Sequence, residues 1–307
     1  MAANMNSELK LVEVTPRDGL QNEKEILSTH DKLSLVESLV EAGFKEIEVT
    51  SFVNPKFVPQ MHDAWEIASK LYNKHPGVTF SALAPNEKGA AKAVEACVDQ
   101  IGVFISATET HNQKNVNMSK IESLRNIEKI SSLAVNNNIK LRGYIVVAFD
   151  CPYEGRVSFK DILEIYKELE ECGIEEVSLG DTTGSADPLY VKEVVNTIKE
   201  KGENRSDLAL HFHDSQGMGL ANIFSAYQEG ARIFDGSVGG VGGSPVTPGA
   251  GGNVAMEDMV NMFEKMEVKT DISLDILVDL AKDLENKLGR VLPGKLAKTW
   301  EKSKDYY

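Results

Sequence analysis

Two histidines separated by one residue, at positions 211 and 213, are the most informative pair in this chain. They lie in the segment 208–214, LALHFHD, whose apolar residues are typical of a β-strand. Because side chains alternate along a strand, His211 and His213 must point to the same side. Two neighbouring imidazoles can bind one divalent metal ion, since neutral imidazole is a common metal ligand. The spacing therefore predicts a metal site.

A second segment supplies a carboxylate and a guanidinium. Residues 9–15, LKLVEVT, also resemble a strand, and they are followed by Pro16, Arg17 and Asp18. Asp18 can complete a His/His/Asp ligand set, and Arg17 beside it can contact an oxyanion that forms at the metal. Ligation by nitrogen and oxygen without cysteine suits Mg, Mn, Co or Zn. These residues predict carbonyl chemistry. The alternative is structural, with two histidines packed in a core and Arg17 in a salt bridge.

The elements that must position these residues alternate between short apolar runs and longer amphipathic runs. Eight strand candidates occupy residues 9–15, 46–52, 79–84, 100–107, 140–149, 175–181, 208–214 and 232–238. Helical periodicity lies between them, for example at 31–42, with Ser28 as a cap and Gly43 as the stop. Helices that end at glycine just before the next strand are typical of repeated βα units.

Eight such units without a linker-like stretch predict an α/β protein with one TIM (β/α)8 barrel. We expect a single domain over 1–307, with the barrel at about 9–255 and a C-terminal helical extension at about 256–307. The alternative is a doubly wound open sheet, which predicts a glycine-rich phosphate turn after an early strand. The first turn here, PRDGLQ, does not fit that pattern.

In a TIM barrel, the chemistry lies at the carboxyl ends of the strands, and polar residues recur there in this chain. Buried polar groups are costly without partners or a function, so their convergence predicts an active site. Glu48 and Asp181 are candidate catalytic carboxylates that could hold a water molecule. The candidate substrate-binding residues are Arg17, Gln21, Ser51, Ser106, Arg142, Tyr144, Ser178 and Thr182.

The segment after the eighth strand, 239–253, contains seven glycines and two prolines. Neither helix nor strand accommodates this composition, so we expect a loop that could close over the mouth of the barrel. A simple surface loop is the alternative. Asn253, at the end of the loop, can add a carbonyl ligand to the metal or a positioning hydrogen bond.

Composition excludes several classes of protein. A net charge of −14 leaves no basic stripe for the phosphates of nucleic acid. No apolar run approaches the ~20 residues that a membrane span needs. The three cysteines, Cys97, Cys151 and Cys172, show no paired spacing, and the N-terminal residues resemble neither a secretory signal nor a transit peptide. We therefore expect a cytoplasmic protein that binds neither nucleic acid nor membranes.

An ordered set of motifs resembles 3-hydroxy-3-methylglutaryl-CoA lyases. The motifs are TPRDGLQNE (15–23), EVTSFVNPK (48–56), CPYEG (151–155), SLGDT (178–182), HFHD (211–214) and GGSP…GGNVAMED (242–258). The resemblance extends from about residue 9 to residue 295. It implies a TIM barrel with a divalent metal, often Mg or Mn, held by Asp18, His211, His213 and Asn253. It also implies an acyl-CoA substrate and a homodimer.

The implied reaction is retro-Claisen cleavage of 3-hydroxy-3-methylglutaryl-CoA to acetoacetate and acetyl-CoA. In this scheme Arg17 stabilises the enolate of acetyl-CoA, and His211 or a carboxylate-held water removes the hydroxyl proton. The pattern departs from the family at the catalytic candidate Ser244, where the family has a cysteine, and at Val246, where it has a tyrosine. A serine cannot supply a thiolate near neutral pH.

These departures leave three alternatives beside the lyase that acts on the methylglutaryl substrate. The first is a related lyase for another 3-hydroxyacyl-CoA, which the changed loop would favour. The second is a Claisen-type condensing synthase, although we expect no regulatory domain after the barrel. The third is a sensor that binds metal and acyl-CoA without turnover, which the retained Arg17, Asp18 and histidines oppose.

Overall fold

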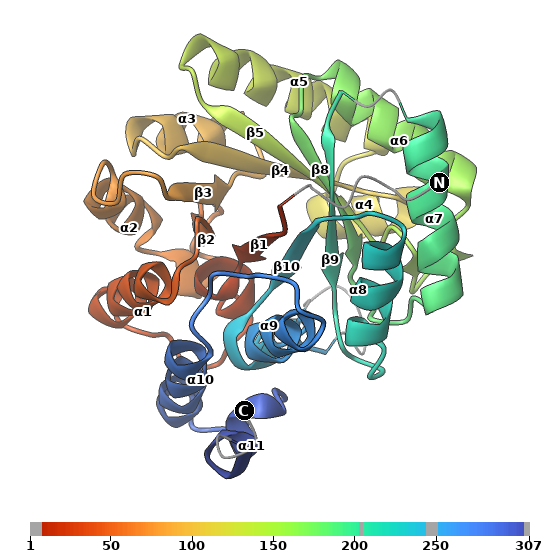
Figure 1. Ribbon diagram of the computed structural model, residues 1–307. Helices are drawn as coiled ribbons and strands as arrows, with labels where there is room; N and C mark the ends of the chain where they lie inside the picture. The colour runs from red at the N-terminus through yellow and green to blue at the C-terminus, as the bar shows by residue number, and fades with distance from the viewer. Residues whose placement is uncertain (1–7, 203–204, 244–250, 304–307) are drawn as a thin grey trace.

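A closed barrel of eight parallel strands forms the centre of the protein, as a computed structural model shows (Figure 1). The structure describes residues 8–202, 205–243 and 251–303. Around the barrel the strands follow the order β1, β10, β9, β8, β5, β4, β3, β2. Their bounds are β1 (Lys10–Glu13), β2 (Glu46–Ser51), β3 (Thr79–Leu83), β4 (Gln100–Ser106), β5 (Lys140–Val146), β8 (Glu176–Asp181), β9 (Asp207–Phe212) and β10 (Ile233–Gly236). The predicted TIM barrel is confirmed.

Helices surround the barrel (Figure 1). They are α1 (Thr29–Ala42), α2 (Ala64–Leu71), α3 (Glu87–Glu95), α4 (Glu109–Val116), α5 (Lys120–Asn136), α6 (Phe159–Glu171), α7 (Pro188–Lys201), α8 (Gly219–Gln228), α9 (Met256–Lys265), α10 (Leu274–Leu288) and α11 (Leu296–Ser303). Short elements are the π-helix η1 (Thr15–Gly19), the 3-10 helices η2 (Pro59–Met61) and η3 (Val238–Gly240), and a hairpin of β6 (Asp150–Cys151) and β7 (Gly155–Arg156).

The ends of α1 show how the sequence sets the helix boundaries. At its start, the Ser28 side chain accepts a hydrogen bond from the Asp31 backbone at 3.1 Å, as predicted. At its end, Gly43 has a φ of 115°, a left-handed conformation that disfavours other residues. A Cβ at this glycine would lie 2.3 Å from the Asp271 carbonyl oxygen, so a side chain would also clash with the segment before α10.

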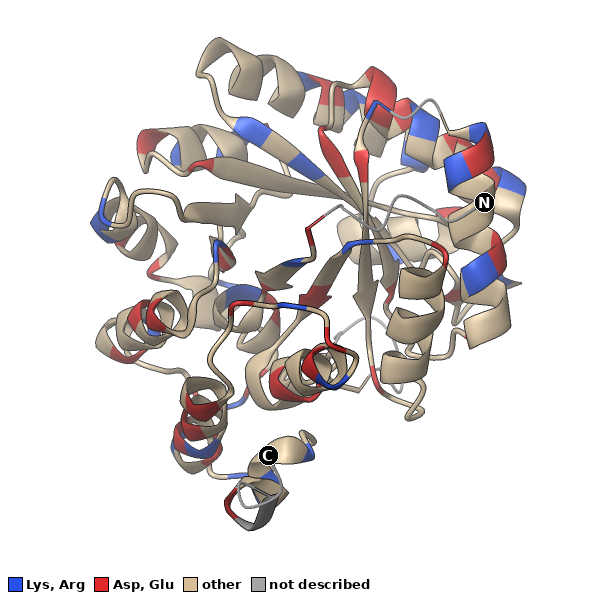
Figure 2. Cartoon of the chain, viewed as in Figure 1, with Lys and Arg blue, Asp and Glu red and all other residues tan. Residues whose placement is uncertain are grey.

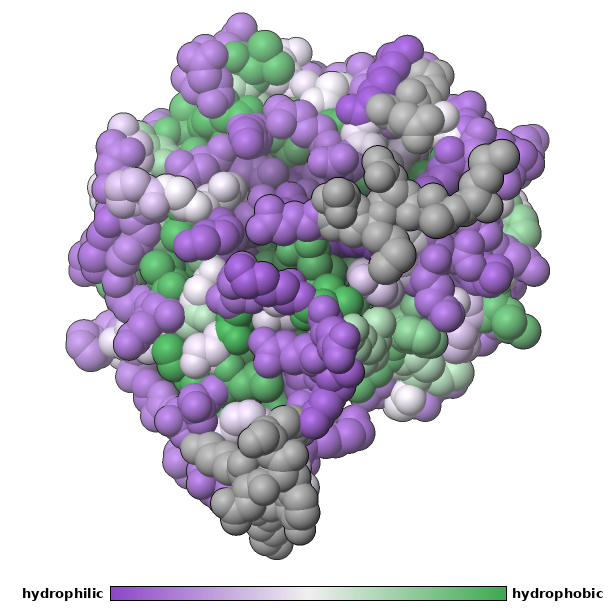
Figure 3. Space-filling view, in the orientation of Figure 1, coloured by the Kyte–Doolittle hydropathy of each residue, from purple (hydrophilic) through white to green (hydrophobic). Residues whose placement is uncertain are grey.

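The apolar core lies mainly between the strands and the surrounding helices, where the outward-facing strand residues are buried. Inside the barrel, a small separate cluster of Val12, Val14, Ala209 and Ile233 is apolar. Charged side chains occupy much of the remaining interior, and Figure 2 shows such residues on several strands as well as on the outer helices. Hydrophilic residues cover most of the face that Figure 3 shows. The polar barrel interior is therefore the feature that needs explanation.

Seven of the eight predicted strands end one to three residues earlier in the structure, and three of them show why. The first ends at Glu13, because the chain turns into η1 around Pro16, whose ring fixes φ and removes an N–H donor. The fifth ends at Val146, and Val147 then takes a left-handed φ of 51°. The strand with the histidines ends at Phe212, although His213 still pairs with Asn253 in an isolated bridge.

The C-terminal helices pack onto the barrel. Helix α9 follows β10, and α10 contacts both α9 and α1, so it bridges the last and first helices of the ring. The division at residue 255 between barrel and extension stays a prediction. In the described ranges, no helix combines the length and the apolarity that crossing a membrane would require.

Candidate active site

The two histidines and Asp18 meet at the mouth of the barrel, as the sequence predicted. The rings of His211 and His213 lie side by side with their centroids 5.3 Å apart. Asp18 comes from η1, and one ligand atom from each of these three buried residues lies within 4.8 Å of the others. One carboxylate and two imidazoles converging in this way form a site that can hold a metal ion.

Both imidazoles are oriented by hydrogen bonds at their Nδ1 atoms. The Nδ1 atom of His211 lies 3.1 Å from Asp235, and that of His213 lies 2.9 Å from the carbonyl oxygen of Gly251. Because both partners accept hydrogen bonds, Nδ1 donates and Nε2 keeps its lone pair. Burial and the neighbouring His211 lower the pKa of His213 to about 4, which favours the neutral form that binds metal.

Asn253 supplies a further oxygen at the same place. Its Nδ2 atom donates hydrogen bonds to Asp18 at 2.8 Å and to the Val241 carbonyl at 3.0 Å. Its Oδ1 atom is buried and has no hydrogen-bond partner in the described part of the chain. A buried amide oxygen without a partner is costly, and a cation would satisfy it. The residues present therefore fit a bound metal.

The charge balance inside the barrel points the same way. Ion pairs link a group of charged side chains that runs from the floor of the barrel to its mouth. The basic members are Lys10, Arg17 and Arg142, and the acidic members are Asp18, Glu46, Glu48, Glu176 and Asp235. Three cations against five carboxylates leave an excess of two carboxylates, which a divalent cation would balance.

Arg17 is held between two carboxylates. Its Nε atom donates to Glu48 at 2.5 Å, and its Nη1 atom donates to Asp18 at 2.6 Å. Burial would raise the pKa of Asp18, but Arg17 and the two histidines lower it overall. Burial raises the pKa of Glu48, and the charge of Arg17 offsets only part of that rise. The salt bridge that we considered as an alternative is present, and it fixes the guanidinium beside the candidate metal ligands.

Four more predicted residues reach this cluster. Gln21 donates to Asp18 at 2.8 Å, and the hydroxyl of Tyr144 lies 3.3 Å from Glu48. The hydroxyl of Ser178 lies 3.3 Å from the inner carboxylate Asp235. Arg142 also joins the network, but it is 1% exposed and all three of its nitrogens contact protein groups. The structure therefore favours a supporting role for Arg142 over substrate binding.

The other predicted residues have partners outside this cluster. Ser51 donates to the Leu83 carbonyl, Ser106 pairs with His111, and Thr182 accepts from the Val147 backbone. Asp181 accepts hydrogen bonds from the backbone of Ser185 and Ala186, at 3.2 Å each. These contacts hold the loop after β8. Burial raises the pKa of Asp181 to about 6 although the amides oppose the shift. Ser244 lies outside the described residues.

Sequence reasoning missed Asp235, which holds His211 in place. This residue lies in β10 between Phe234 and Gly236, and its own exposure is 1%. Burial alone would raise the pKa of Asp235, but Arg142 and His211 hold this pKa at about 2. The signal was an acidic residue in the apolar eighth strand, at a position that alternates inward. The contact of His213 with Gly251 could not be found from residue types, because a backbone carbonyl carries no sequence signal.

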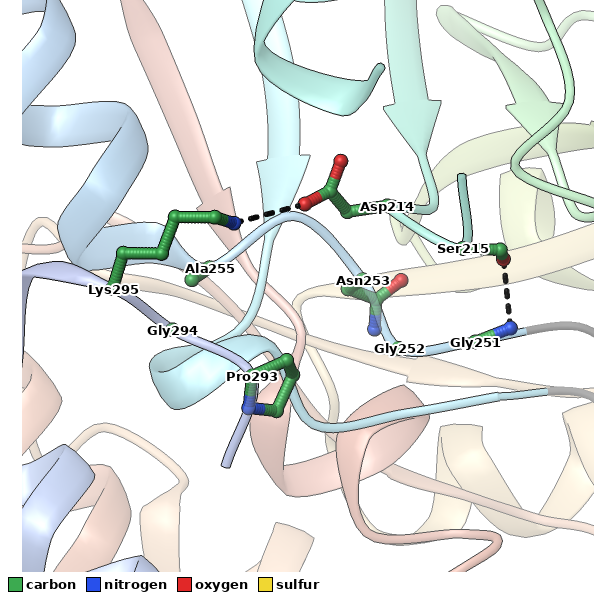
Figure 4. A pocket seen from close by; sticks show the side chains of 9 residues that line it. All are labelled: Asp214, Ser215, Gly251, Gly252, Asn253, Ala255, Pro293, Gly294 and Lys295. Atoms are coloured by element: carbon green, nitrogen blue, oxygen red, sulfur yellow. Dashed lines mark hydrogen bonds and ion pairs between the residues drawn. The ribbon is translucent and has the colours of Figure 1, made fainter. Parts of the chain in front are cut away.

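A cavity of about 240 Å³ opens next to the candidate metal ligands (Figure 4). Asn253 lines it, together with the loop after β9 and the segment before α11. Lys295 contacts Asp214 across one side at 3.3 Å, and the Gly251 amide donates to Ser215 across another. The cavity gives the site an adjoining space that a substrate could use.

Comparisons with known proteins agree with this geometry. A hydroxymethylglutaryl-CoA lyase of Bacillus subtilis is 41% identical over 95% of this chain and 97% of its own length. A 3-hydroxy-3-isohexenylglutaryl-CoA/hydroxymethylglutaryl-CoA lyase of Pseudomonas aeruginosa is 41% identical over 88% of this chain and 89% of its own. An HMG-CoA lyase structure from Acinetobacter baumannii, solved with coenzyme A and 3-methylmalate, superposes with a TM-score of 0.90. It shares 38% identity and covers 97% of this chain and 96% of its own.

The match to a family model covers the whole barrel. The HMGL-like family model matches residues 8–284, which include η1, both histidines and Asn253. The resemblance noted from the motifs is confirmed. The Arg-Asp turn after β1 and the His-x-His segment at β9 agree with these matches. The matches show that this chain belongs to the HMGL-like family.

Proposed function

We propose that this protein is a carbon–carbon lyase that cleaves 3-hydroxy-3-methylglutaryl-CoA to acetoacetate and acetyl-CoA. The observation that carries the proposal is the convergence of Asp18, His211 and His213 beside Arg17. This arrangement occurs in a chain that is 41% identical to a hydroxymethylglutaryl-CoA lyase over almost its full length. A site of this kind can bind oxygen atoms of a substrate and stabilise negative charge next to them.

Asp18, His211, His213 and Asn253 would hold a divalent metal, and we propose Mg or Mn because oxygen supplies half of this ligand set. The metal would supply positive charge at the oxygens of the hydroxyacyl group. The buried Asn253 oxygen and the excess of carboxylates support this proposal. Co and Zn also suit mixed nitrogen and oxygen ligands, and metal-dependent activity would distinguish among the four.

Arg17 would act on the other half of the substrate. When the bond between C2 and C3 breaks, negative charge develops on the thioester oxygen of the departing acetyl-CoA enolate. A guanidinium fixed beside the metal ligands can donate hydrogen bonds to that oxygen without reorganising. Glu48 contributes by holding Arg17 in this position through the contact at 2.5 Å. Interactions that strengthen as charge develops lower the barrier directly.

The C3 hydroxyl must lose its proton during the cleavage. Two groups at the mouth can take it: a water hydrogen-bonded to Asp18 or Glu48, or the Nε2 atom of His211 when this atom is not ligating the metal. The Nε2 atom of His211 lies 3.8 Å from Asp18, so both candidates occupy the same small region. Asp235 would stabilise positive charge on His211 from the opposite side of the ring.

Incubating the purified protein with 3-hydroxy-3-methylglutaryl-CoA and Mg or Mn tests the proposal. We expect acetoacetate and acetyl-CoA in equal amounts. Formation of neither product by folded, metal-loaded protein would overturn it. A condensing synthase would instead consume an acyl-CoA and an oxo acid, and a sensor would bind acyl-CoA without releasing product.

A second candidate function is cleavage of a substrate with a longer branch. The relative from Pseudomonas aeruginosa carries both a methylglutaryl and an isohexenylglutaryl activity in its name. The serine and valine at positions 244 and 246, where we expect cysteine and tyrosine from the family, also favour a changed substrate. Measuring kcat/KM for both acyl-CoAs, in the wild type and in Ser244→Cys, decides between them. We expect the cysteine variant to gain activity on the methylglutaryl substrate.

We also propose that the protein is a homodimer and that it acts in the cytoplasm. Both proposals come from the family resemblance and from the composition of the chain. Sedimentation equilibrium over a range of concentrations tests the first, with twice the 33.7 kDa chain mass as the expected result. Fractionation of the cells that make the protein tests the second.

A further inference from the structure

A closed ring of polar contacts connects the metal side of the site with the arginine side through the barrel interior. Starting from Arg142 on β5, one arm reaches the metal ligand His211, and the other arm reaches Arg17. At the mouth, the arms meet again where Asp18 lies between Arg17 and His211. Arg142 is 1% exposed, so it supports both arms from beneath the site.

The first arm passes through Asp235. The Nη2 atom of Arg142 donates to one oxygen of this carboxylate at 2.6 Å, and the Nδ1 atom of His211 contacts the other oxygen at 3.1 Å. Arg142 thus fixes the plane of the carboxylate that in turn fixes the imidazole. The orientation of a ligating imidazole depends on the partner at its second nitrogen, so this contact affects how well Nε2 can meet a metal.

The second arm passes through Tyr144 and Glu48. The Nη1 atom of Arg142 donates to the Tyr144 hydroxyl at 2.8 Å, and that hydroxyl donates to one oxygen of Glu48 at 3.3 Å. The other oxygen of Glu48 accepts from the Nε atom of Arg17 at 2.5 Å. The hydroxyl of Tyr144, together with Glu48, therefore links Arg142 to the guanidinium of Arg17. We expect this guanidinium to face the thioester oxygen.

Arg142 itself is anchored to the floor of the barrel. Its Nε atom donates to Glu176 on β8 at 2.5 Å, and Glu176 also pairs with Lys10 on β1. Its three nitrogens therefore point in three directions at fixed angles, toward groups on β8, β5 and β10. Only the planar guanidinium offers donors in this fork, because a lysine carries a single nitrogen.

We propose that Arg142 is a positioning residue that fixes the metal ligand His211 and the catalytic Arg17 in the correct positions relative to each other. The inference rests on the proposed function only for the arginine arm, because the metal arm predicts a change in ion binding alone. Arg142 touches neither group directly. Its effect on each must pass through Asp235 on one side and through Tyr144 and Glu48 on the other.

The test compares Mn²⁺ affinity, measured by calorimetry without acyl-CoA, with the kinetics of cleavage. We expect Arg142→Lys to weaken Mn²⁺ binding by roughly 10–100-fold, and to lower kcat by a similar factor at saturating Mn²⁺. Asp235→Asn should weaken Mn²⁺ binding by a comparable factor, because it alters the support of His211. Tyr144→Phe should lower kcat while it leaves Mn²⁺ affinity within about twofold, because it breaks only the arginine arm.

The matched control is Lys32→Met, which removes a buried cation from a different place. Lys32 pairs with Asp63 at 2.7 Å in the helical layer, with only 2% of its side chain exposed. We expect this variant to melt at a lower temperature while Mn²⁺ affinity and kcat stay within about twofold of the wild type. A merely structural Arg142 would behave in the same way as Lys32.

A folded Arg142→Lys protein that binds Mn²⁺ within twofold of the wild type would overturn the proposal. If this variant does not fold, Asp235→Asn and Tyr144→Phe test the two arms separately, and the proposal fails if both bind and turn over as the wild type does. The double variant Arg142→Lys/Asp235→Asn should bind Mn²⁺ no more weakly than the poorer single variant, because both act on one arm. Because ion binding is measured without substrate, failure of the lyase assay would leave the metal arm fully testable.

Discussion

Two buried ionic groups in this protein differ in how completely their atoms are satisfied. In the helical layer, Lys32 contacts Asp63 and the Gln60 carbonyl, and the second oxygen of Asp63 accepts from Thr29 at 2.8 Å. At the mouth of the barrel, by contrast, a single Arg17 lies between two carboxylates. There one ligand atom each of Asp18 and the two histidines lies within 4.8 Å of the others, and the oxygen of Asn253 has no partner in the described chain.

The difference separates a group that stabilises the fold from one that is built for a ligand. In the Lys32–Asp63 pair, contacts inside the protein offset the free energy that is lost when both charges leave water. The mouth cluster keeps an excess of lone pairs and negative charge, and such an arrangement is costly unless a cation completes it. The fold positions the atoms of the mouth cluster, but these atoms do not stabilise the folded state. They therefore indicate function, and each variant below asks whether the two groups respond differently.

The largest effect should come from His211→Ala. This change removes one imidazole from the cluster and leaves Asp235 with Arg142 as its main partner. We expect lyase activity to fall to the detection limit and Mn²⁺ binding to be lost in calorimetry, while the circular dichroism spectrum stays that of a folded barrel. Activity close to that of the wild type would contradict the site assignment.

Arg17→Lys should have the next largest effect. A lysine keeps the charge but cannot contact Glu48 and Asp18 with separate nitrogens and still reach a substrate oxygen. Loss of one donor to a developing oxyanion typically costs about 10²–10³ in rate, and we expect kcat to fall by that factor. Steady-state kinetics at saturating Mn²⁺ measures it. A raised KM with an unchanged kcat would instead mean that Arg17 only binds the ground state.

Lys32→Met should have the opposite effect to the mouth variants, because it should lower stability and leave activity unchanged. Removing one member of a buried ion pair leaves the other charge without compensation and costs about 3–5 kcal/mol. We expect a clearly lower midpoint in urea unfolding, with kcat/KM per folded molecule unchanged. If this variant lost activity in proportion to the mouth variants, the distinction between the two groups would not hold.

A third buried group predicts a smaller, pH-dependent effect. Glu13 and Glu257 each have one oxygen that is buried and unpartnered among the described residues. Burial raises their pKa values to about 8 and about 7, from an ordinary value of 4.5. Between pH 4.5 and these values, the folded protein therefore holds protons that the unfolded chain releases. Stability should decline as the pH rises through this window.

Glu257→Gln removes one of these groups. We expect its melting temperature to fall less between pH 5 and pH 8 than that of the wild type, with a difference of a few degrees. Differential scanning calorimetry at both pH values measures the change. Glu264→Gln, an exposed change on the same helix, is the control and should follow the wild type. Equal slopes in all three proteins would show that Glu257 is ionised in the folded state.

Much of this architecture could be predicted from local patterns. The eight strands, the helix boundaries at Ser28 and Gly43, and the convergence of Asp18 with the two histidines follow from periodicity, capping and strand alternation. These signals lie within a few residues of each other, or at the same end of parallel strands. The barrel then brings together residues as distant as Asp18 and Asn253 by its topology alone.

The parts that could not be predicted depend on partners from distant strands. Arg142 and Asp235 are 93 residues apart, and only the closed barrel brings their side chains together at 2.6 Å. Arg142 therefore looked like a substrate-binding arginine at a strand end, although all its nitrogens are engaged inside the barrel. Asp181 looked like a site carboxylate, but its acceptor atoms hold its own loop, since backbone amides of that loop lie close to them.

The most direct test is to follow cleavage of 3-hydroxy-3-methylglutaryl-CoA while chelator-treated protein is titrated with Mn²⁺. We predict no acetoacetate from the metal-free protein, and activity that rises with the occupancy of one ion per chain and then stays constant. The Asp18→Asn protein should neither bind the ion at this stoichiometry nor gain activity. Full activity without metal, or activity that is independent of occupancy, would contradict the conclusion that the mouth cluster is a metal site.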